Sequence, residues 1–268
     1  MFAQRRPIIK LSRSSRECSH IEGDVLEGLS LSFNGGKDCS VLLYLLMLVL
    51  PDVYGIEVSS TLRIKAVYIR DQEPFPEMES FVQYCAQRYR LEVSTYDPPM
   101  RESLVKYVKE QPDVKAIFMG TRKTDPFSQS LHLQDRCNTE QGWPNVMRVL
   151  PLLDWHYHHV WGFLRSSTAS PGAAQRGWCT LYNRGFTSLG SMHNTVPNPA
   201  LKIKRADGEH ETPSDEAYYD ERLKAYYLPA WRLEDATLER AGRDQQIRDH
   251  QTSDAKDEGM MKQCTECI

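Results

Sequence analysis

The residues best suited to chemistry stand together at positions 32–38, Ser-Phe-Asn-Gly-Gly-Lys-Asp, immediately before an apolar run. Two adjacent glycines let the backbone approach a ligand closely, and the first turn of a following helix presents free N–H groups to an anion. Lys37 adds a positive charge, while Asp38 could cap the helix or lie near a metal held by phosphates. A Walker loop is excluded, because it requires G-x-x-x-x-G-K-[ST]. We therefore expect a phosphate-binding loop of another kind.

Such a loop must be positioned by a strand before it and a helix after it, and the surrounding pattern predicts both. Apolar runs predict strands at 29–33, 64–69, 91–96 and 114–119. Between them, helices are expected at 38–49, from Pro76 onward and at 101–110, with Pro51 ending the first of these. The chain thus alternates strand and helix four times.

This alternation predicts an α/β fold with a mostly parallel, twisted sheet and helices on both faces. Ligands of such sheets bind at the carboxyl ends of the strands. The glycine pair follows the first strand, and Gly120 follows the fourth in the loop Gly-Thr-Arg-Lys-Thr-Asp-Pro, residues 120–126. We therefore expect these two loops, distant in sequence, to form one site.

The remainder of the chain is less regular. We expect a helix at 154–165, a surface loop at 166–177, a short strand at 178–182 and an irregular C-terminal extension up to residue 243. Residues 1–27 form an N-terminal arm in this interpretation, and residues 244–268 form a polar tail. The expected organisation is one α/β domain over residues 28–243.

Composition limits the classes of partner. The chain has 268 residues, of which 33 are Lys or Arg and 36 are Asp or Glu, for a formal charge of -3. This balance provides no overall field for nucleic acid or an anionic membrane. The apolar run at 41–50 is half the length of a membrane span, and seven scattered cysteines argue for reduced thiols rather than a disulfide framework. We expect a cytoplasmic monomer that binds small molecules.

Several motifs in order resemble the eukaryotic, fungal-type FMN adenylyltransferases, or FAD synthetases, of the PAPS reductase-like group of ATP-pyrophosphatase folds. They are the glycine-pair loop, the 120–126 loop, Arg148 followed by Pro-Leu-Leu-Asp-Trp at 151–155, the segment 181–190, and Pro-Ala-Trp at 229–231 with Glu-Arg-Ala-Gly-Arg at 239–243. The resemblance covers about residues 28–243. It implies transfer of AMP from ATP to the phosphate of FMN, giving FAD and pyrophosphate with Mg²⁺, which the substrate phosphates would mainly hold.

The resemblance also implies a role for each matching residue. Those expected to take part in the transfer are Asn34, Asp38, Asp125, Arg240 and Arg243. Those expected to bind ATP and its phosphates are Ser32, Asn34, Gly35, Gly36, Lys37, Asp38, Gly120 and Arg122. Those expected to bind the flavin are Asp125, Glu140, Trp143 and Arg148. No protein nucleophile is needed, because the FMN phosphate attacks in line and catalysis rests on positioning and on neutralising charge.

The chain departs from the family pattern at four positions and contains an insertion. Lys123 replaces a second Arg, Phe127 replaces Tyr, Asn183 replaces Asp, and Glu140 replaces the flavin Asp in a segment, 135–141, that is longer than in the family. The 166–177 loop is longer as well. These departures leave open a catalytically weak protein that binds flavin or nucleotide. A second alternative is another enzyme of the group, such as a PAPS reductase, which would depend on a C-terminal thiol such as those of Cys264-Thr265-Glu266-Cys267.

Overall fold

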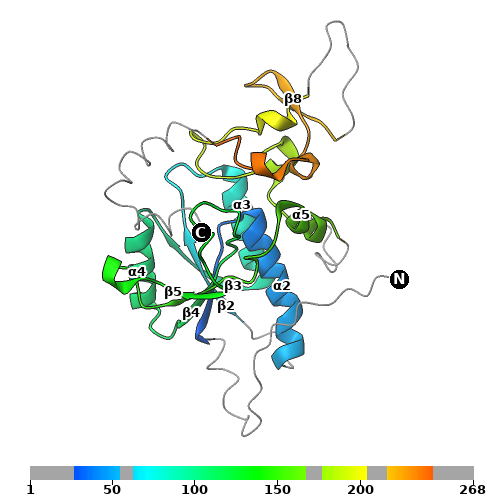
Figure 1. Ribbon diagram of the computed structural model, residues 1–268. Helices are drawn as coiled ribbons and strands as arrows, with labels where there is room; N and C mark the ends of the chain where they lie inside the picture. Colours follow the sequence, from blue (N-terminus) through cyan, green and yellow to red (C-terminus); the bar gives the residue numbers. More distant parts are fainter. Residues whose placement is uncertain (1–26, 55–62, 167–176, 204–215, 244–268) are drawn as a thin grey trace, which may run out of the picture.

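The computed structural model describes residues 27–54, 63–166, 177–203 and 216–243 (Figure 1). Five short 3-10 helices, η1 to η5, accompany the helices and strands of this part of the chain. The strands are β1 (Leu29–Ser32), β2 (Ile64–Ile69), β3 (Leu91–Tyr96), β4 (Ala116–Phe118), β5 (Gln134–Arg136), β6 (Met147–Val149), β7 (Tyr218–Asp220) and β8 (Ala225–Tyr227). The α-helices are α2 (Lys37–Tyr54), α3 (Pro76–Tyr89), α4 (Met100–Glu110) and α5 (Tyr157–Arg165).

Six strands form one sheet in the order β3-β2-β1-β4-β6-β5. All neighbours pair in parallel except β5 and β6, which are antiparallel at one edge. The chain leaves β1 for β2 on one side and returns to place β4 on the other, so the direction of winding reverses between β1 and β4. The predicted α/β class with a mostly parallel sheet is confirmed, and the reversal is where such sheets bind ligands.

Helices cover both faces of this sheet, as expected. Buried side chains of α2, α3 and α5 form one apolar core with residues of β1 and β2, and side chains of α4 form a second core with Val67, Ile117 and others. In Figure 1, α4 lies to one side of the strands while α2 and α5 lie to the other. In the described part of the chain, no helix combines the length and apolar character that crossing a membrane requires.

The C-terminal extension packs onto the first of these cores rather than building a core of its own. Leu181, Tyr182, Leu201, Ala230 and Leu233 are all buried in the same cluster as residues of β1 and α2. Its yellow and orange segments gather beyond one end of the sheet in Figure 1. The extension is therefore placed to form a wall beside the carboxyl ends of the strands.

Two local predictions differ from the structure, and two short strands are additional to those predicted. Helix α2 does not end before Pro51 but continues to Tyr54, because proline removes one N–H near the end of a helix that is already nucleated. Residues 178–182 are not a strand, since η2 (Thr180–Arg184) occupies this stretch. The short strands β5 and β6 were not expected. The 166–177 loop, the arm and the polar tail lie almost entirely outside the described residues.

Candidate active site

A cleft of about 340 Å³ opens at the carboxyl edge of the sheet, beside β1, β2 and β4. Its volume falls within the range of small-molecule sites. It is lined by the glycine-pair loop, by residues after β2, by the 120–126 loop and by the C-terminal extension. The two loops that the sequence predicts to lie together therefore line one cleft, and the extension supplies the third wall.

The glycine-pair loop is shaped by its own side chains. Asn34 Oδ1 accepts hydrogen bonds from the Gly36 N–H at 2.9 Å and from Cys39 Sγ at 3.1 Å. Gly35 has φ +78°, a left-handed conformation that favours glycine, and a Cβ there would lie 3.1 Å from Val82 Cγ2. The loop thus turns tightly and delivers Lys37 and Asp38 to the start of α2, as the sequence predicts.

A side chain at position 120 is excluded by the close approach of the loop after β4 to the start of α2. A Cβ at this position would lie 2.8 Å from the backbone nitrogen of Cys39 and 2.9 Å from the carbonyl carbon of Asp38. Real Cβ atoms are not found at such distances from backbone atoms. Only glycine lets the loop after β4 rest this closely against the first turn of α2.

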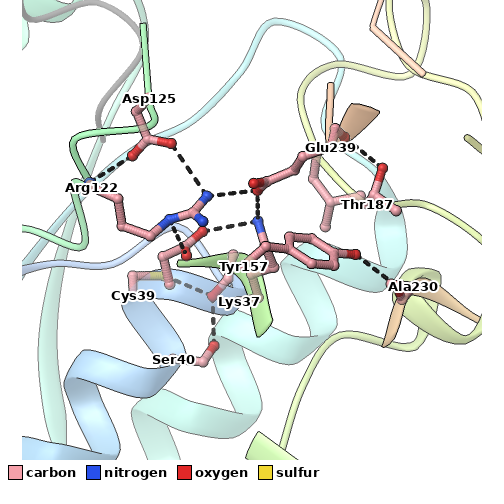
Figure 2. A network of polar contacts seen from close by, with 12 residues as sticks. Lys37, Cys39, Ser40, Arg122, Asp125, Tyr157, Thr187, Ala230 and Glu239 are labelled. Carbon is pink, nitrogen blue, oxygen red and sulfur yellow. Dashed lines mark hydrogen bonds and ion pairs between the residues drawn. The ribbon is translucent and has the colours of Figure 1, made fainter. Parts of the chain in front are cut away.

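A buried network of charges joins the three walls (Figure 2). Glu239 Oε1 accepts from Lys37 Nζ at 2.5 Å and from Arg122 Nη2 at 2.6 Å. Arg122 also contacts Asp125 Oδ1 at 3.3 Å, and its backbone N–H donates to Asp125 Oδ2 at 2.8 Å. Arg122 Nε lies 2.9 Å from Asp38 Oδ1 without the alignment of a hydrogen bond. Arg122 therefore contacts three carboxylates, each from a different segment.

Burial and neighbouring charges set the protonation of this network. Burial opposes ionisation of Asp38, but the Lys37 and Arg122 charges outweigh it and hold the pKa of this carboxyl below its ordinary value. Burial raises the pKa of Asp125 to about 6, and the nearby Asp38 charge acts in the same direction against the pull of Arg122. Burial would lower the pKa of Lys37, but Asp38 and Glu239 raise it. Lys37 is therefore a cation at neutral pH.

Two donor groups in the cleft wall have no acceptor among the residues that the structure describes. Arg122 is 1% exposed, and its Nη1 makes no hydrogen bond. Ser32, at the end of β1, is 3% exposed, and its Oγ also makes no hydrogen bond within the described part of the chain. A buried polar group without a partner costs free energy, so such groups are expected where a ligand completes the site. Phosphate oxygens would satisfy both of these groups.

Arg240 and Arg243 line the cleft from the C-terminal extension. The backbone N–H of Arg243 donates to the carbonyl of Arg240 at 3.0 Å, which makes a compact turn. Arg243 Nη1 donates to the carbonyl of Leu189 at 2.7 Å, and a Cβ on Gly190 would clash with the guanidinium. Both arginines thus line the same cleft as the glycine-pair loop.

Most of the predicted site residues meet in this one cleft. Those that line it are Ser32, Asn34, Gly36, Lys37, Asp38, Gly120, Arg122, Asp125, Arg240 and Arg243. Gly35 lies in the same turn, but its α-carbon faces α3. The structure therefore brings together the residues that the sequence assigns to the transfer and to ATP, while their individual roles stay predictions.

Three of the four residues predicted to bind the flavin lie away from this cleft. Trp143 is buried in the second apolar core, and Glu140 is exposed on η1 (Thr139–Gln141). Arg148, on β6, lies 3.6 Å from Asp135 Oδ1, its partner in the β5–β6 register. The carboxylate facing Arg148 is therefore Asp135 rather than Glu140. Their role in flavin binding stays a prediction.

The sequence did not indicate every residue of the site. In the sequence Glu239 is only the first residue of the 239–243 motif, but in the structure it bridges Lys37 and Arg122. Tyr182 accepts a hydrogen bond from the Lys37 backbone N–H at 2.8 Å, and burial raises its pKa well above the ordinary value, so it stays neutral. Residues after β2, such as Asp71, could have been expected, because this strand ends at the same edge of the sheet.

Comparison with known proteins identifies the family. Residues 28–197 match the phosphoadenosine phosphosulfate reductase domain. The chain is 38% identical to the probable FAD synthase of Schizosaccharomyces pombe over 222 residues, which are 82% of this chain and 73% of that protein.

Solved structures agree with this match. Candida glabrata FMN adenylyltransferase in complex with FAD and inorganic pyrophosphate is 32% identical, with a TM-score of 0.68 and coverage of 81% of each chain. The same enzyme in complex with FMN and the ATP analogue AMPCPP has a TM-score of 0.67 at 32% identity, covering 81% of this chain and 79% of that one. The chain belongs to the phosphoadenosine phosphosulfate reductase domain family and, within it, to the group of FAD synthases, or FMN adenylyltransferases.

Proposed function

We propose that this chain is an FMN adenylyltransferase, which transfers AMP from ATP to the phosphate of FMN. The observation that carries the proposal is the convergence of Lys37, Arg122, Arg240 and Arg243 on one cleft beside a glycine-pair loop. Four cations from three segments suit a triphosphate. Structures of the Candida glabrata relative with FAD and pyrophosphate, and with FMN and an ATP analogue, support the same reaction.

The step requires no covalent intermediate with the protein. An oxygen of the FMN phosphate attacks the α-phosphorus of ATP, a new P–O bond forms, and the bond to the bridging oxygen of the β-phosphate breaks. Pyrophosphate leaves with that electron pair. In this reaction Lys37 and Arg122 would hold the nucleotide phosphates, while Arg240 and Arg243 would neutralise the charge on the leaving pyrophosphate.

The charge balance of the cleft supports a requirement for Mg²⁺. Four cationic side chains line it, and so do four acidic ones, Asp38, Asp71, Asp125 and Glu239. A balanced cleft gives no net attraction to free ATP, so countercharge must arrive with the nucleotide. Among the described residues no three acids, histidines or cysteines form a metal cage. Asp38, Asp71 and Asp125 are cleft carboxylates that would face a magnesium ion held mainly by the phosphates, where the ion would neutralise phosphate charge.

A direct assay tests the proposal. The purified chain is incubated with ATP, Mg²⁺ and FMN, and the flavins are separated by chromatography. We expect FAD to form with one pyrophosphate per FAD, and not to form in a boiled control. Absence of FAD above that control would exclude the proposal. Flavin binding without turnover would favour the catalytically weak binder, and sulfite release from PAPS would favour a reductase.

Two substitutions test the placement of the reaction in this cleft. Asp125→Ala and Arg240→Ala are each expected to lower turnover while the circular dichroism spectrum stays native. The matched control is Lys123→Ala, because this exposed side chain pairs only with exposed Asp154 among the described contacts. Unchanged turnover in both variants would remove the site from this cleft without affecting the assignment of the reaction.

We also propose that the protein acts as a cytoplasmic monomer. Cys39, Cys85, Cys137 and Cys179 are free and buried, as a reducing compartment would keep them. Light scattering after size-exclusion chromatography measures the oligomeric state directly. A mass twice that of the chain would contradict the monomer.

A further inference from the structure

Glu239 is the one described side chain that contacts cations from both loops of the cleft with a single oxygen. Its Oε1 lies 2.5 Å from Lys37 Nζ, at the start of α2, and 2.6 Å from Arg122 Nη2, in the loop after β4 (Figure 2). The side chain is 11% exposed. Asp38 contacts the same two cations, but through separate oxygens. Because a charge-assisted bond weakens steeply when its geometry changes, the shared oxygen of Glu239 restrains the spacing between the two cationic groups directly.

The backbone around Glu239 is fixed as firmly as its side chain. The Glu239 carbonyl accepts from Thr187 Oγ1 at 2.6 Å, and the preceding Leu238 carbonyl accepts from Asn198 Nδ2 at 2.7 Å. Asn198 Nδ2 also donates to Thr187 Oγ1 at 2.8 Å, and both side chains are fully buried. Glu239 therefore links the C-terminal extension to the two loops and restrains their positions relative to one another.

The two arginines of the extension follow at once. Arg240 is the next residue, and Arg243 closes the turn that begins with it. The distance between these guanidinium groups and the Lys37–Arg122 pair depends on the segment that Glu239 anchors. A displacement of about 1 Å in a positioning group can cost about a hundredfold in rate.

The negative charge of Glu239 acts against ATP rather than for it. Its carboxylate already neutralises the two cations that the nucleotide would use, so it weakens the attraction of the cleft for an anion. Glu239 therefore disfavours ATP binding electrostatically, yet it contacts both Lys37 and Arg122. Its contribution to the reaction must come from the geometry that it imposes on these two side chains. This separates its expected effect on turnover from its expected effect on affinity.

We propose that Glu239 is a positioning residue for adenylyl transfer: by holding Lys37 and Arg122 at a fixed spacing and anchoring Arg240 and Arg243, it raises turnover without improving ATP affinity. The proposal rests on the function proposed above. It assigns to the first residue of the 239–243 motif a role separate from that of the arginines that follow it.

The test compares Glu239→Gln with the unmodified chain. We expect kcat for FAD formation to fall about 10- to 100-fold. Isothermal titration with AMPCPP and Mg²⁺ is expected to give one site per chain and a Kd equal to or lower than that of the unmodified protein. The measured stoichiometry separates slow turnover from a loss of folded protein. Glu234→Gln is the matched control, because Glu234 is exposed in the same segment, and we expect it to change neither quantity.

Three outcomes would overturn the proposal while FAD formation by the unmodified chain leaves the proposed function intact. They are a kcat within twofold of the unmodified chain, a tenfold weaker Kd, and full activity in Glu239→Asp. The last variant keeps the charge but withdraws the carboxylate by about 1 to 1.5 Å, so we expect about a tenfold lower kcat with Kd nearly unchanged. If Glu239→Gln does not fold, Glu239→Asp alone tests the proposal. If the unmodified chain makes no FAD, it is the proposed function that fails.

Discussion

Asp38 and Asp125 both contact Arg122, but their pKa values shift in opposite directions. Asp38 faces both Lys37 and Arg122, and its pKa is held below its ordinary value, although burial opposes this. Asp125 faces Arg122 as well, but burial and the charge of Asp38 raise its pKa to about 6. The network therefore keeps Asp38 ionised, while Asp125 changes its protonation just below neutral pH.

This difference predicts a pH-dependent stability. Because the folded chain holds the Asp125 proton up to a pH of about 6 and the unfolded chain releases it near 4, stability falls as pH rises between these values. We expect the unfolding free energy of the unmodified chain, minus that of Asp125→Asn, to fall by up to about 3 kcal/mol from pH 4 to pH 7. Urea denaturation at several pH values measures it. A difference that stays constant, or rises with pH, would contradict the raised pKa.

Arg122 and Lys123 are adjacent but have different environments, which predicts different effects of substitution. Arg122 is 1% exposed and contacts three carboxylates, whereas the Lys123 side chain is half exposed and pairs with Asp154. Arg122→Lys keeps the charge but loses the planar fork. We expect about a 10- to 100-fold loss of affinity for AMPCPP, equivalent to about 1.4 to 2.8 kcal/mol. Lys123→Ala is expected to change affinity less than twofold, and an equal loss in both would contradict this distinction.

At the scale of elements, the first turn of α2 and the loop after β4 form one packed unit through Gly120. Gly120→Ala would force a Cβ to within 3 Å of two backbone atoms, which cannot move as a side chain could. We expect a loss of about 1 to 3 kcal/mol in unfolding free energy. Gly162→Ala is the matched control: it lies within α5, where a new Cβ meets nothing within 4 Å. There we expect a gain of about 0.5 to 1 kcal/mol. Equal effects at both glycines would exclude the close packing.

The elements that the sequence predicts well are those with a strong local pattern. Strand β2 has the expected bounds, and α3 begins at Pro76, where a helix start is expected. It buries Met78, Phe81, Val82 and Cys85, which recur at helical spacing, while Tyr89 in the same pattern is half-buried. Strands β5 and β6 have three residues each and pair only with distant segments, so no local period identifies them. The predicted strand at 178–182 is wrong because tertiary contacts override the local preference. Its aromatic residues suit a strand, but Trp178 and Tyr182 pack on Trp161 instead.

Site residues too are predictable from sequence only where a local pattern identifies them. Glycine and lysine in a short loop after a strand predict an anion site from local chemistry, and the alternating pattern places Gly120 beside it. Glu239 carries no such signal, because an acidic residue near two arginines in sequence is usually a solvated pair. Its partners are more than a hundred residues away in sequence. Only the docked C-terminal extension brings this carboxylate to Lys37.

The whole molecule is expected to unfold as one unit, because the C-terminal extension shares its core with the sheet. Trp161, Trp178 and Trp231 pack against one another, so tryptophan fluorescence mainly reports on the junction of α5 with the extension. Far-ultraviolet circular dichroism reports mainly on α2, α3 and α4. We expect both signals to give the same urea midpoint, and AMPCPP with Mg²⁺ at about 100 times its Kd to raise both unfolding free energies by about 2.7 kcal/mol. A fluorescence change at a lower urea concentration would mean that the extension detaches first. In that case the wall carrying Glu239, Arg240 and Arg243 would be a separate unit, and residues 28–243 would not be a single domain.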